Sequence, residues 1–219
     1  MLGTLSQTGV ARRPVRIGAL ATLSRNFQKE FLQPLLRRAD VELVLRSGSA
    51  EELLRGLQSV NLDVVLTNQA PGTDALLPFV VHHLSAQRVS LVGAPALLGK
   101  VRGPAELLAT HPVILPSHGS SVRTGFDGLA DRLGVRLQIA AEVDDIAMMR
   151  LLVREGHALA VLPPIAVRDE LAACVLIEAD ELRGIVETSY AVTTKRRYPN
   201  PVVNSLLKNA SKTERAATS

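Results

Sequence analysis

Short apolar runs alternate with longer amphipathic stretches from residue 15 onward. The pattern predicts three strands and two helices in alternation, at 15–21, 24–38, 41–46, 49–59 and 62–67. In the first helix Phe27, Phe31 and Leu35 recur at helical spacing and form an apolar stripe, whereas Pro34 should kink that helix or end it. Strands that are separated by helical crossovers are expected to pair in parallel.

The same order of elements returns in the second half of the chain. Strands and helices are predicted at 113–116, 120–133, 136–141, 144–155 and 157–163. Each element starts 95 to 98 residues after its counterpart. Gly134 and Gly156 stand where two of these helices are expected to end. So regular a spacing predicts two equivalent lobes.

Two further apolar runs, 87–93 and 185–193, predict strands that cross between the lobes. We therefore expect an α/β fold of two Rossmann-like lobes joined by a two-strand hinge, with a cleft between them. A terminal helix is expected at 201–210. The expected divisions are a leader, a discontinuous first lobe, a second lobe and a tail, at 1–14, 15–88 with 188–210, 89–187 and 211–219.

The composition fits such a fold. The 219 residues are 47% hydrophobic but only 3% aromatic, which predicts an aliphatic core. The single cysteine, Cys174, cannot form an intramolecular disulfide, and its apolar neighbours predict a buried thiol. The N-terminus shows no sustained apolar region, and no segment reaches the roughly 18 apolar residues of a membrane span. We therefore expect a soluble, cytoplasmic protein.

The net charge of +4 raises the question of nucleic-acid binding. The basic residues are dispersed, with Arg12 and Arg13 in the leader, a short cluster at 195–197 and others in the tail. No basic helix interleaved with aromatic residues occurs. The distribution is typical of a solvated surface.

Polar residues follow the predicted strands, where ligands bind in open parallel sheets. The candidate binding residues are Thr22, Ser24, Ser47, Thr67, Asn68, Ser117, Ser121 and Asp144. Their hydroxyls, together with free N–H groups at helix starts, favour a small anion, particularly a carboxylate.

Several of these positions also allow a structural role. Ser121 and Asp144 stand where a helix N-cap is needed, and Ser49 with Glu52 forms an S-x-x-E capping box. Arg123, in the first turn of a helix, would either pair with a ligand carboxylate or reach into solvent. His118, beside the expected cleft, is the histidine that most merits a test.

Motifs of catalysis are absent from the sequence. The five histidines show no metal-binding spacing with a carboxylate, and neither a nucleophile elbow nor a glycine-rich phosphate loop occurs. We therefore predict no catalytic residue, no metal and no cofactor.

Two stretches carry a family resemblance. The first runs from VRIGALATL through FLQPLLRRADVELVLRSGSAEELLRGLQSVNLDVVLT, and the second is GHALAVLP, in which His157 and Ala158 depart from the usual residues. The matching positions of the first stretch are Gly48, Leu53, Leu57, Leu62 and Asp63. Over residues 15–209 the chain resembles the effector-binding domain of LysR-type transcription regulators, which has the fold of type 2 periplasmic binding proteins.

The resemblance implies a small-molecule effector in the cleft and a homodimer, or alternatively a tetramer, formed through the helices at 24–38 and 120–133. It also implies DNA binding through a winged helix-turn-helix ahead of this domain, for which about 14 residues are too few. Either that module was trimmed from the sequence or the protein lost it, and we favour trimming. In both cases we expect that the chain alone does not bind operator DNA.

Two segments, AEVDDIAMMRLL and ALATLSRNF, resemble the branch that activates sodium/proton antiporter genes. In that branch the signal would be sodium or the proton, and His118 and the pair Asp144–Asp145 would gain interest. Two adjacent acids alone do not make a site for a hard cation.

Two other protein classes share this kind of architecture. A short-form ATP phosphoribosyltransferase of histidine synthesis would need an acidic phosphate loop rich in glycine and threonine, which the sequence lacks. A solute-binding protein for transport would need an export signal. A ligand-sensing regulatory domain, not an enzyme, is the prediction.

Overall fold

The computed structural model describes residues 12–72, 79–99, 103–196 and 199–217, with side chains only up to residue 210 in the last segment. The predicted leader lies almost wholly outside the described residues. The predicted tail begins inside the terminal helix α8, Pro201–Ala217, so that helix is longer than the sequence pattern indicates. No helix in the described segments is long and apolar enough to cross a membrane.

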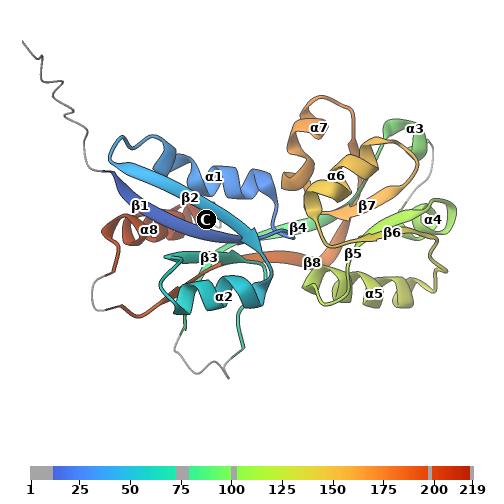
Figure 1. Cartoon of the computed structure of the whole chain (residues 1–219). Coiled ribbons are helices and arrows are strands. Elements are labelled where there is room, and N and C mark those ends of the chain that lie inside the picture. Colours follow the sequence, from blue (N-terminus) through green and yellow to red (C-terminus); the bar gives the residue numbers. More distant parts are fainter. Residues whose placement is uncertain (1–11, 73–78, 100–102, 197–198, 218–219) are drawn as a thin grey trace, which may run out of the picture.

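Eight strands form a single sheet within the described residues, in the order β2-β1-β3-β8-β4-β7-β5-β6. The strands are β1 Arg13–Leu20, β2 Val41–Gly48, β3 Val64–Thr67, β4 Phe79–Gly93, β5 Val113–Pro116, β6 Ile139–Val143, β7 Leu159–Leu162 and β8 Ile177–Thr194. Figure 1 shows them as two groups, β1 to β3 on one side and β5 to β7 on the other.

The pairing of strands repeats between the two groups. β1 pairs in parallel with β2 and β3, and β5 pairs in parallel with β6 and β7. On the inner side, β3 pairs antiparallel with β8, and β7 pairs antiparallel with β4. The sheet therefore confirms the parallel, duplicated arrangement that the element spacing predicts.

The long strands β4 and β8 join the two groups as an antiparallel pair. Their register runs from Phe79 opposite Thr194 to Gly93 opposite Ile177, so both strands belong to both halves of the molecule (Figure 1). The predicted crossing runs, 87–93 and 185–193, are parts of these strands. The exact lobe limits at 88/89 and 187/188 remain a prediction.

Helices cover both faces of the sheet. In Figure 1, α1 and α2 lie on opposite faces of the first group of strands, and α6 and α5 on opposite faces of the second. The four long crossover helices are α1 Arg25–Leu36, α2 Ala50–Gln58, α5 Ser121–Leu133 and α6 Ile146–Arg154. Helix α1 continues past Pro34 by two residues and then ends, so the proline lies in its last turn.

Four short helical elements were not predicted from the sequence. They are α3 Pro95–Leu98, α4 Pro104–Thr110, the 3₁₀ turn η1 Pro164–Val167 and α7 Arg168–Ala172. Three of them begin with proline, whose fixed φ and missing N–H suit the first helical position. Elements of four to seven residues are too short to show helical periodicity.

The helix caps differ in part from the prediction. The Ser49–Glu52 capping box at α2 is confirmed. Helix α5 is capped by Ser120, whose Oγ accepts a hydrogen bond from Arg123 N at 3.0 Å, so the cap expected at Ser121 is wrong. Helix α6 is capped by Asp145, not Asp144. In both cases the cap is the adjacent residue of the same type. The helix begins one residue away from the start that the predicted cap implies, and this shift decides which of the two residues is the cap.

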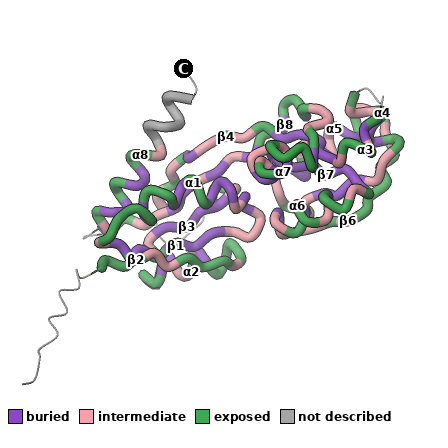
Figure 2. The backbone as a smooth tube through the Cα atoms, turned by 90° about the horizontal axis from the view of Figure 1, so that it is seen from above, coloured by how far each residue is buried: buried purple, intermediate pink, exposed green. Residues whose placement is uncertain are grey.

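The core is aliphatic, as the composition predicts, and follows the strands. Figure 2 shows buried residues concentrated along the strands and exposed residues on the outer sides of the helices. Leu57 of α2 and Phe126 of α5 are fully buried against opposite ends of the sheet. Burial of one such side chain contributes about 2 kcal/mol.

Cys174 is exposed, so the prediction of a buried thiol is wrong. Helix α7 ends just before it, and Cys174 adopts a positive φ of 54° that turns the chain toward β8. The neighbouring Leu176 enters the core instead.

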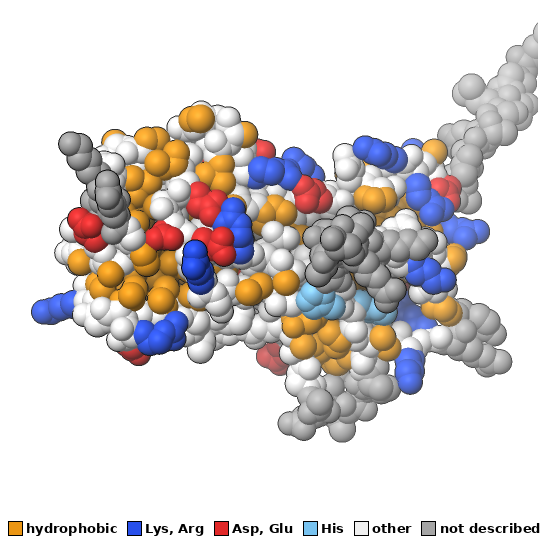
Figure 3. Space-filling view, turned by 180° about the vertical axis from the view of Figure 1, so that it is seen from behind, with side chains coloured by type: hydrophobic (Ala, Val, Ile, Leu, Met, Phe, Trp, Pro, Cys, Tyr) orange, Lys and Arg blue, Asp and Glu red, His pale blue; other side chains and the backbone are white. Residues whose placement is uncertain are grey.

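The basic residues form no continuous stripe on the face seen in Figure 3. Lysine and arginine side chains are dispersed there, several of them beside acidic ones. This agrees with a solvated surface on that face.

Candidate functional site

A cleft of about 430 Å³ lies between the two halves of the molecule. Its first wall consists of residues at the ends of β1, β2 and β3, and its second wall of residues at the ends of β5, β6 and β7. The carboxyl ends of parallel strands meet here from both sides, as expected for open α/β sheets. This volume is within the range of sites for small molecules.

Four of the eight predicted binding residues line this cleft. Thr22 follows β1, Asn68 follows β3, Ser117 follows β5 and Asp144 follows β6. The duplicated topology brings these positions together although they are up to 122 residues apart in the chain (22 to 144). That they contact a ligand remains a prediction.

The other four predicted residues lie outside the lining of the cleft. Ser24 is fully buried and caps α1, and Ser121 is the first residue of α5. The Thr67 hydroxyl donates to Gln69 O at 2.9 Å and accepts from Gln69 N at 3.1 Å, so it closes a turn after β3. Ser47 Oγ accepts from Arg25 at 3.4 Å. Local backbone structure occupies the side chains of Ser24 and Thr67.

Glu187 is a cleft residue that sequence reasoning missed. It lies on β8 where this strand crosses between the halves, and only 4% of it is exposed. Burial raises the pKa of the Glu187 carboxyl to about 7, and a hydrogen bond from Asn68 opposes this shift. The alternation of side chains along β8 could have indicated this position. Glu187 lies on the same face of the strand as the buried Ile185 and Ser189.

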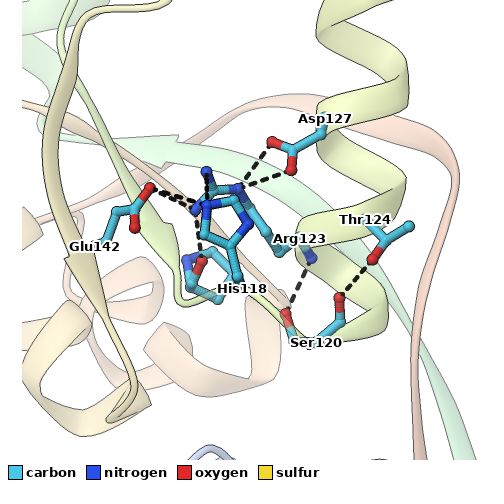
Figure 4. Close-up of polar contacts among 7 residues, drawn as sticks. His118, Ser120, Arg123, Thr124, Asp127 and Glu142 are labelled. Atoms are coloured by element: carbon cyan, nitrogen blue, oxygen red, sulfur yellow. Dashed lines mark hydrogen bonds and ion pairs between the residues drawn. The ribbon is translucent and has the colours of Figure 1, made fainter.

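Arg123 takes neither of the roles considered for it. Its guanidinium is 6% exposed and binds the protein's own acids, with Nε 2.8 Å from Asp127 Oδ1 and Nη1 2.8 Å from Glu142 Oε1 (Figure 4). Nη1 also donates to Pro116 O at 3.2 Å. Burial lowers the pKa of Arg123, but the hydrogen bonds to both acids outweigh it and keep the pKa above its ordinary value.

His118 stands at the mouth of the cleft beside this cluster, 70% exposed. Arg123 Nη2 lies 3.1 Å from His118 Nε2 (Figure 4). A guanidinium can only donate, so His118 Nε2 is the acceptor in this contact. The same Nε2 lies 3.6 Å from Glu142 Oε1.

Hydrogen bonds link the two walls. Gln69, after β3, donates to the carbonyl of Gly119 in the loop before α5. On another side, Asn26 Nδ2 of α1 donates to Ile165 O at 2.9 Å, and Arg168 pairs with Glu30. These contacts hold the halves in the present arrangement.

The cleft is poor in cationic groups. No lysine or arginine is among the described residues that line it, whereas Asp144 and Glu187 are. Helices α2, α5 and α6 all begin at the cleft, which favours anions. However, α2 carries Glu51 and Glu52 in its first turn, and Asp144 and Asp145 precede α6. These acids offset the helix dipoles, so α5 offers the most favourable anion position.

Of the matching positions in the first stretch, Gly48 lines the cleft and the other four have structural roles. Leu53, Leu57 and Leu62 are buried together between α2 and the sheet. Asp63 accepts from Arg16 N at 3.0 Å and from Arg196 at 2.7 Å. These residues build the first lobe rather than its binding surface.

The two-lobed sheet with its hinge and cleft agrees with a match to a family model. The model of the LysR substrate binding domain matches residues 8–213. The chain belongs to this family. It is an effector-binding regulatory domain of a LysR-type transcription regulator and not an enzyme, as the sequence predicts.

Solved structures of LysR regulators share its fold. The regulatory domain of HypT from Salmonella typhimurium in the apo form has a TM-score of 0.72 and 17% identity, covering 93% of this chain and 96% of that chain. The sulfate-bound regulatory domain of an OxyR2 mutant from Vibrio vulnificus has a TM-score of 0.71 and 16% identity, covering 93% of this chain and 97% of that chain. The chain therefore has the type 2 periplasmic-binding-protein-like fold. No curated protein sequence matches the chain.

Proposed function

We propose that this domain senses a small effector in the cleft between its lobes. The observation that carries the proposal is the lining of the cleft, to which strand ends of both lobes contribute. A ligand there would touch Thr22 and Asn68 on one wall and Ser117 and Asp144 on the other. Its binding free energy would then depend on the angle between the lobes, which is what a sensor requires.

The hinge offers the route for such a signal. Only β4 and β8 pass between the lobes in the described part of the chain, and the two strands pair along their length with register shifts near Ser85, Ser90 and Val92. Irregular pairing permits bending. We propose that the effector changes the lobe angle and that the intact regulator transmits this change in the cytoplasm to a winged helix-turn-helix on DNA.

Anions are one class of ligand to test. A bromide-bound structure of the HypT regulatory domain matches this chain with 17% identity, and the OxyR2 structure is sulfate-bound. In this chain Ser120 and the free N–H groups of α5 form the least acidic helix start at the cleft. A carboxylate of the effector would be placed there.

The resemblance to the antiporter-activator branch stays a prediction, and the comparisons give it no support. Among the described residues no group of three or more histidine, cysteine or acidic side chains is placed to hold a metal ion. Asp145 is engaged as the cap of α6. Sodium and the proton are therefore arms of the test rather than the leading proposal.

A homodimer is the proposed assembly, and the structure changes the surfaces proposed for it. Exposed apolar side chains lie on α1, on α6 and on the two edge strands: Leu36, Leu45, Ile139, Met148 and Leu151. Helix α5 exposes no large apolar side chain. We therefore propose α6 in place of α5 as the second-lobe surface, with α1 and β2 from the first lobe. A change to a monomer in Leu151→Glu, measured by sedimentation, would support it.

A ligand screen tests the sensing function. Thermal shifts would be recorded with carboxylates, amino acids, amines and inorganic anions, and with sodium at several pH values. A ligand at 100 times its dissociation constant stabilises the folded chain by about 2.7 kcal/mol. Hits should weaken about fivefold or more in Ser117→Ala and Thr22→Ala but not in Ser205→Ala, whose hydroxyl bonds within α8. Equal affinity in all three variants would move the site away from the cleft.

A further inference from the structure

The cleft contains a buried acid for which the described residues supply no cation. Glu187 is 4% exposed and lines the cleft from β8. Its side-chain partner is the amide of Asn68, which also donates from Nδ2 to Thr22 Oγ1 at 3.3 Å. The ion pairs of the described residues include none to Glu187.

Other enclosed acids of the chain are treated differently. Glu170, 4% exposed, is 2.7 Å from the guanidinium of Arg150. Asp63, with a side chain 9% exposed, is 2.7 Å from Arg196. Where this fold encloses an acid away from the cleft, it therefore provides an arginine.

The isolation of Glu187 has a cost for folding. A carboxyl group removed from water without a cation either remains charged at a penalty of several kcal/mol or takes up a proton. A glutamine of the same shape would keep the contact with Asn68 without that penalty. Folding alone therefore gives no reason for an acid here, whereas a cationic ligand does.

The remaining charges near the cleft agree with a cationic ligand. Asp144 is the second acid of the lining, and no lysine or arginine opposes these two acids within the described lining. The arginine closest in sequence to the second wall, Arg123, is bound by Asp127 and Glu142. The rest of the lining includes the apolar Met149 and Leu162, which suit a hydrocarbon body.

We infer that Glu187 binds an ammonium group of the effector, and that the effector is a small organic amine or amino acid. This inference rests on the proposed sensing function of the cleft. An ammonium carries three donors, and the Glu187 carboxylate and the Thr22 hydroxyl, both partners of the Asn68 amide, are acceptors in the same corner of the cleft. If the effector also carries a carboxylate, the start of α5 on the opposite wall provides its N–H groups.

Matched compounds test the inference. The panel consists of triplets on one carbon skeleton, each with an amino acid, its decarboxylated amine and its deaminated acid; L-leucine, isoamylamine and 4-methylpentanoate are one triplet. Thermal shift and calorimetry measure binding to the domain. We expect binding by at least one compound with an ammonium group and none by its deaminated acid. Binding by the amine alone identifies a monoamine class, and a need for both groups identifies amino acids.

Variants then test the assigned residue. Glu187→Gln should weaken the amine hit by about 10- to 100-fold, because a hydrogen bond between charged groups is lost. Glu187→Asp, which keeps the charge on a shorter side chain, should retain part of the affinity. Glu181→Gln is the matched control, since Glu181 is exposed on the same strand and does not line the cleft. Circular dichroism checks that each variant is folded.

The opposing results are distinct. Binding of deaminated acids without binding of amines would overturn the inference and leave the sensing function of the cleft intact. An amine that binds Glu187→Gln as well as the wild type would overturn the assignment to Glu187. No binding by any triplet would also overturn the inference, while the wider screen of anions and sodium would decide the sensing function separately.

Discussion

Arg123 Nη1 lies 2.8 Å from Glu142 Oε1 and so joins the first turn of α5 to strand β6. The same guanidinium holds Asp127 and the carbonyl of Pro116. The loop that forms the second wall of the cleft, residues 116–120, is therefore supported from behind by one buried cation. A cation in a first helical turn is tolerated because two acids neutralise it.

Arg123→Gln should destabilise the domain by about 2 kcal/mol, because the hydrogen bonds to two carboxylates are lost together. Urea unfolding followed by circular dichroism measures the loss. Arg132→Gln, at an exposed position in the last turn of α5, is the control and should change stability by less than about 0.5 kcal/mol. Equal stability of the two variants would contradict a supporting role for Arg123.

Glu187→Gln should change how stability depends on pH. Burial raises the pKa of Glu187 from 4.5 to about 7, so between these values the folded chain holds a proton that the unfolded chain has released. Stability of the wild type therefore falls as pH rises from about 4.5 to about 7, and this loss persists above pH 7. The variant should gain up to about 3 kcal/mol over wild type at pH 8, and little at pH 4.5. Urea unfolding at pH 4.5 and pH 8 measures the stability of the wild type, of Glu187→Gln and of the control Glu181→Gln. The same difference between Glu187→Gln and the wild type at both pH values would be inconsistent with a buried carboxyl of raised pKa.

Substitutions at the adjacent Ser120 and Ser121 show which of the two serines caps α5. Ser120→Ala removes the hydroxyl that accepts from Arg123 N and should cost about 1 kcal/mol. Ser121→Ala changes the exposed first residue of the helix and should cost less than about 0.5 kcal/mol. Thermal unfolding of both variants gives the comparison, and the reverse order would restore Ser121 as the cap.

The two contacts between α1 and the second lobe should differ in strength. Asn26 is 5% exposed and donates to Ile165 O, so Asn26→Ala should cost about 1 to 2 kcal/mol. The pair Glu30–Arg168 has side chains 48% and 43% exposed, so Arg168→Gln should cost less than about 1 kcal/mol. Chemical denaturation measures both, and solution X-ray scattering would show whether Asn26→Ala opens the lobes. A larger loss from Arg168→Gln would contradict this order.

The element order was predictable because helices and strands have different hydrophobic periods, and the Ser49–Glu52 box because both partners lie in one turn. The short helices α3, α4 and α7 were missed because one or two turns have too few positions to show a period. Cys174 was expected in the core because its neighbours are apolar, yet it occupies a turn with positive φ. The composition of a segment does not determine which of its side chains a turn directs toward solvent.

For the candidate site, the sequence by itself determined that Thr22, Asn68, Ser117 and Asp144 follow strands of a duplicated parallel sheet, which places them near one edge. Tertiary structure alone decided that Glu142 of strand β6 neutralises Arg123 and that Glu187 enters the cleft, where no described residue supplies a cation. The difference is physical. Periodicity depends on residues a few positions apart, whereas the environment of a charge depends on groups that folding brings from distant parts of the chain.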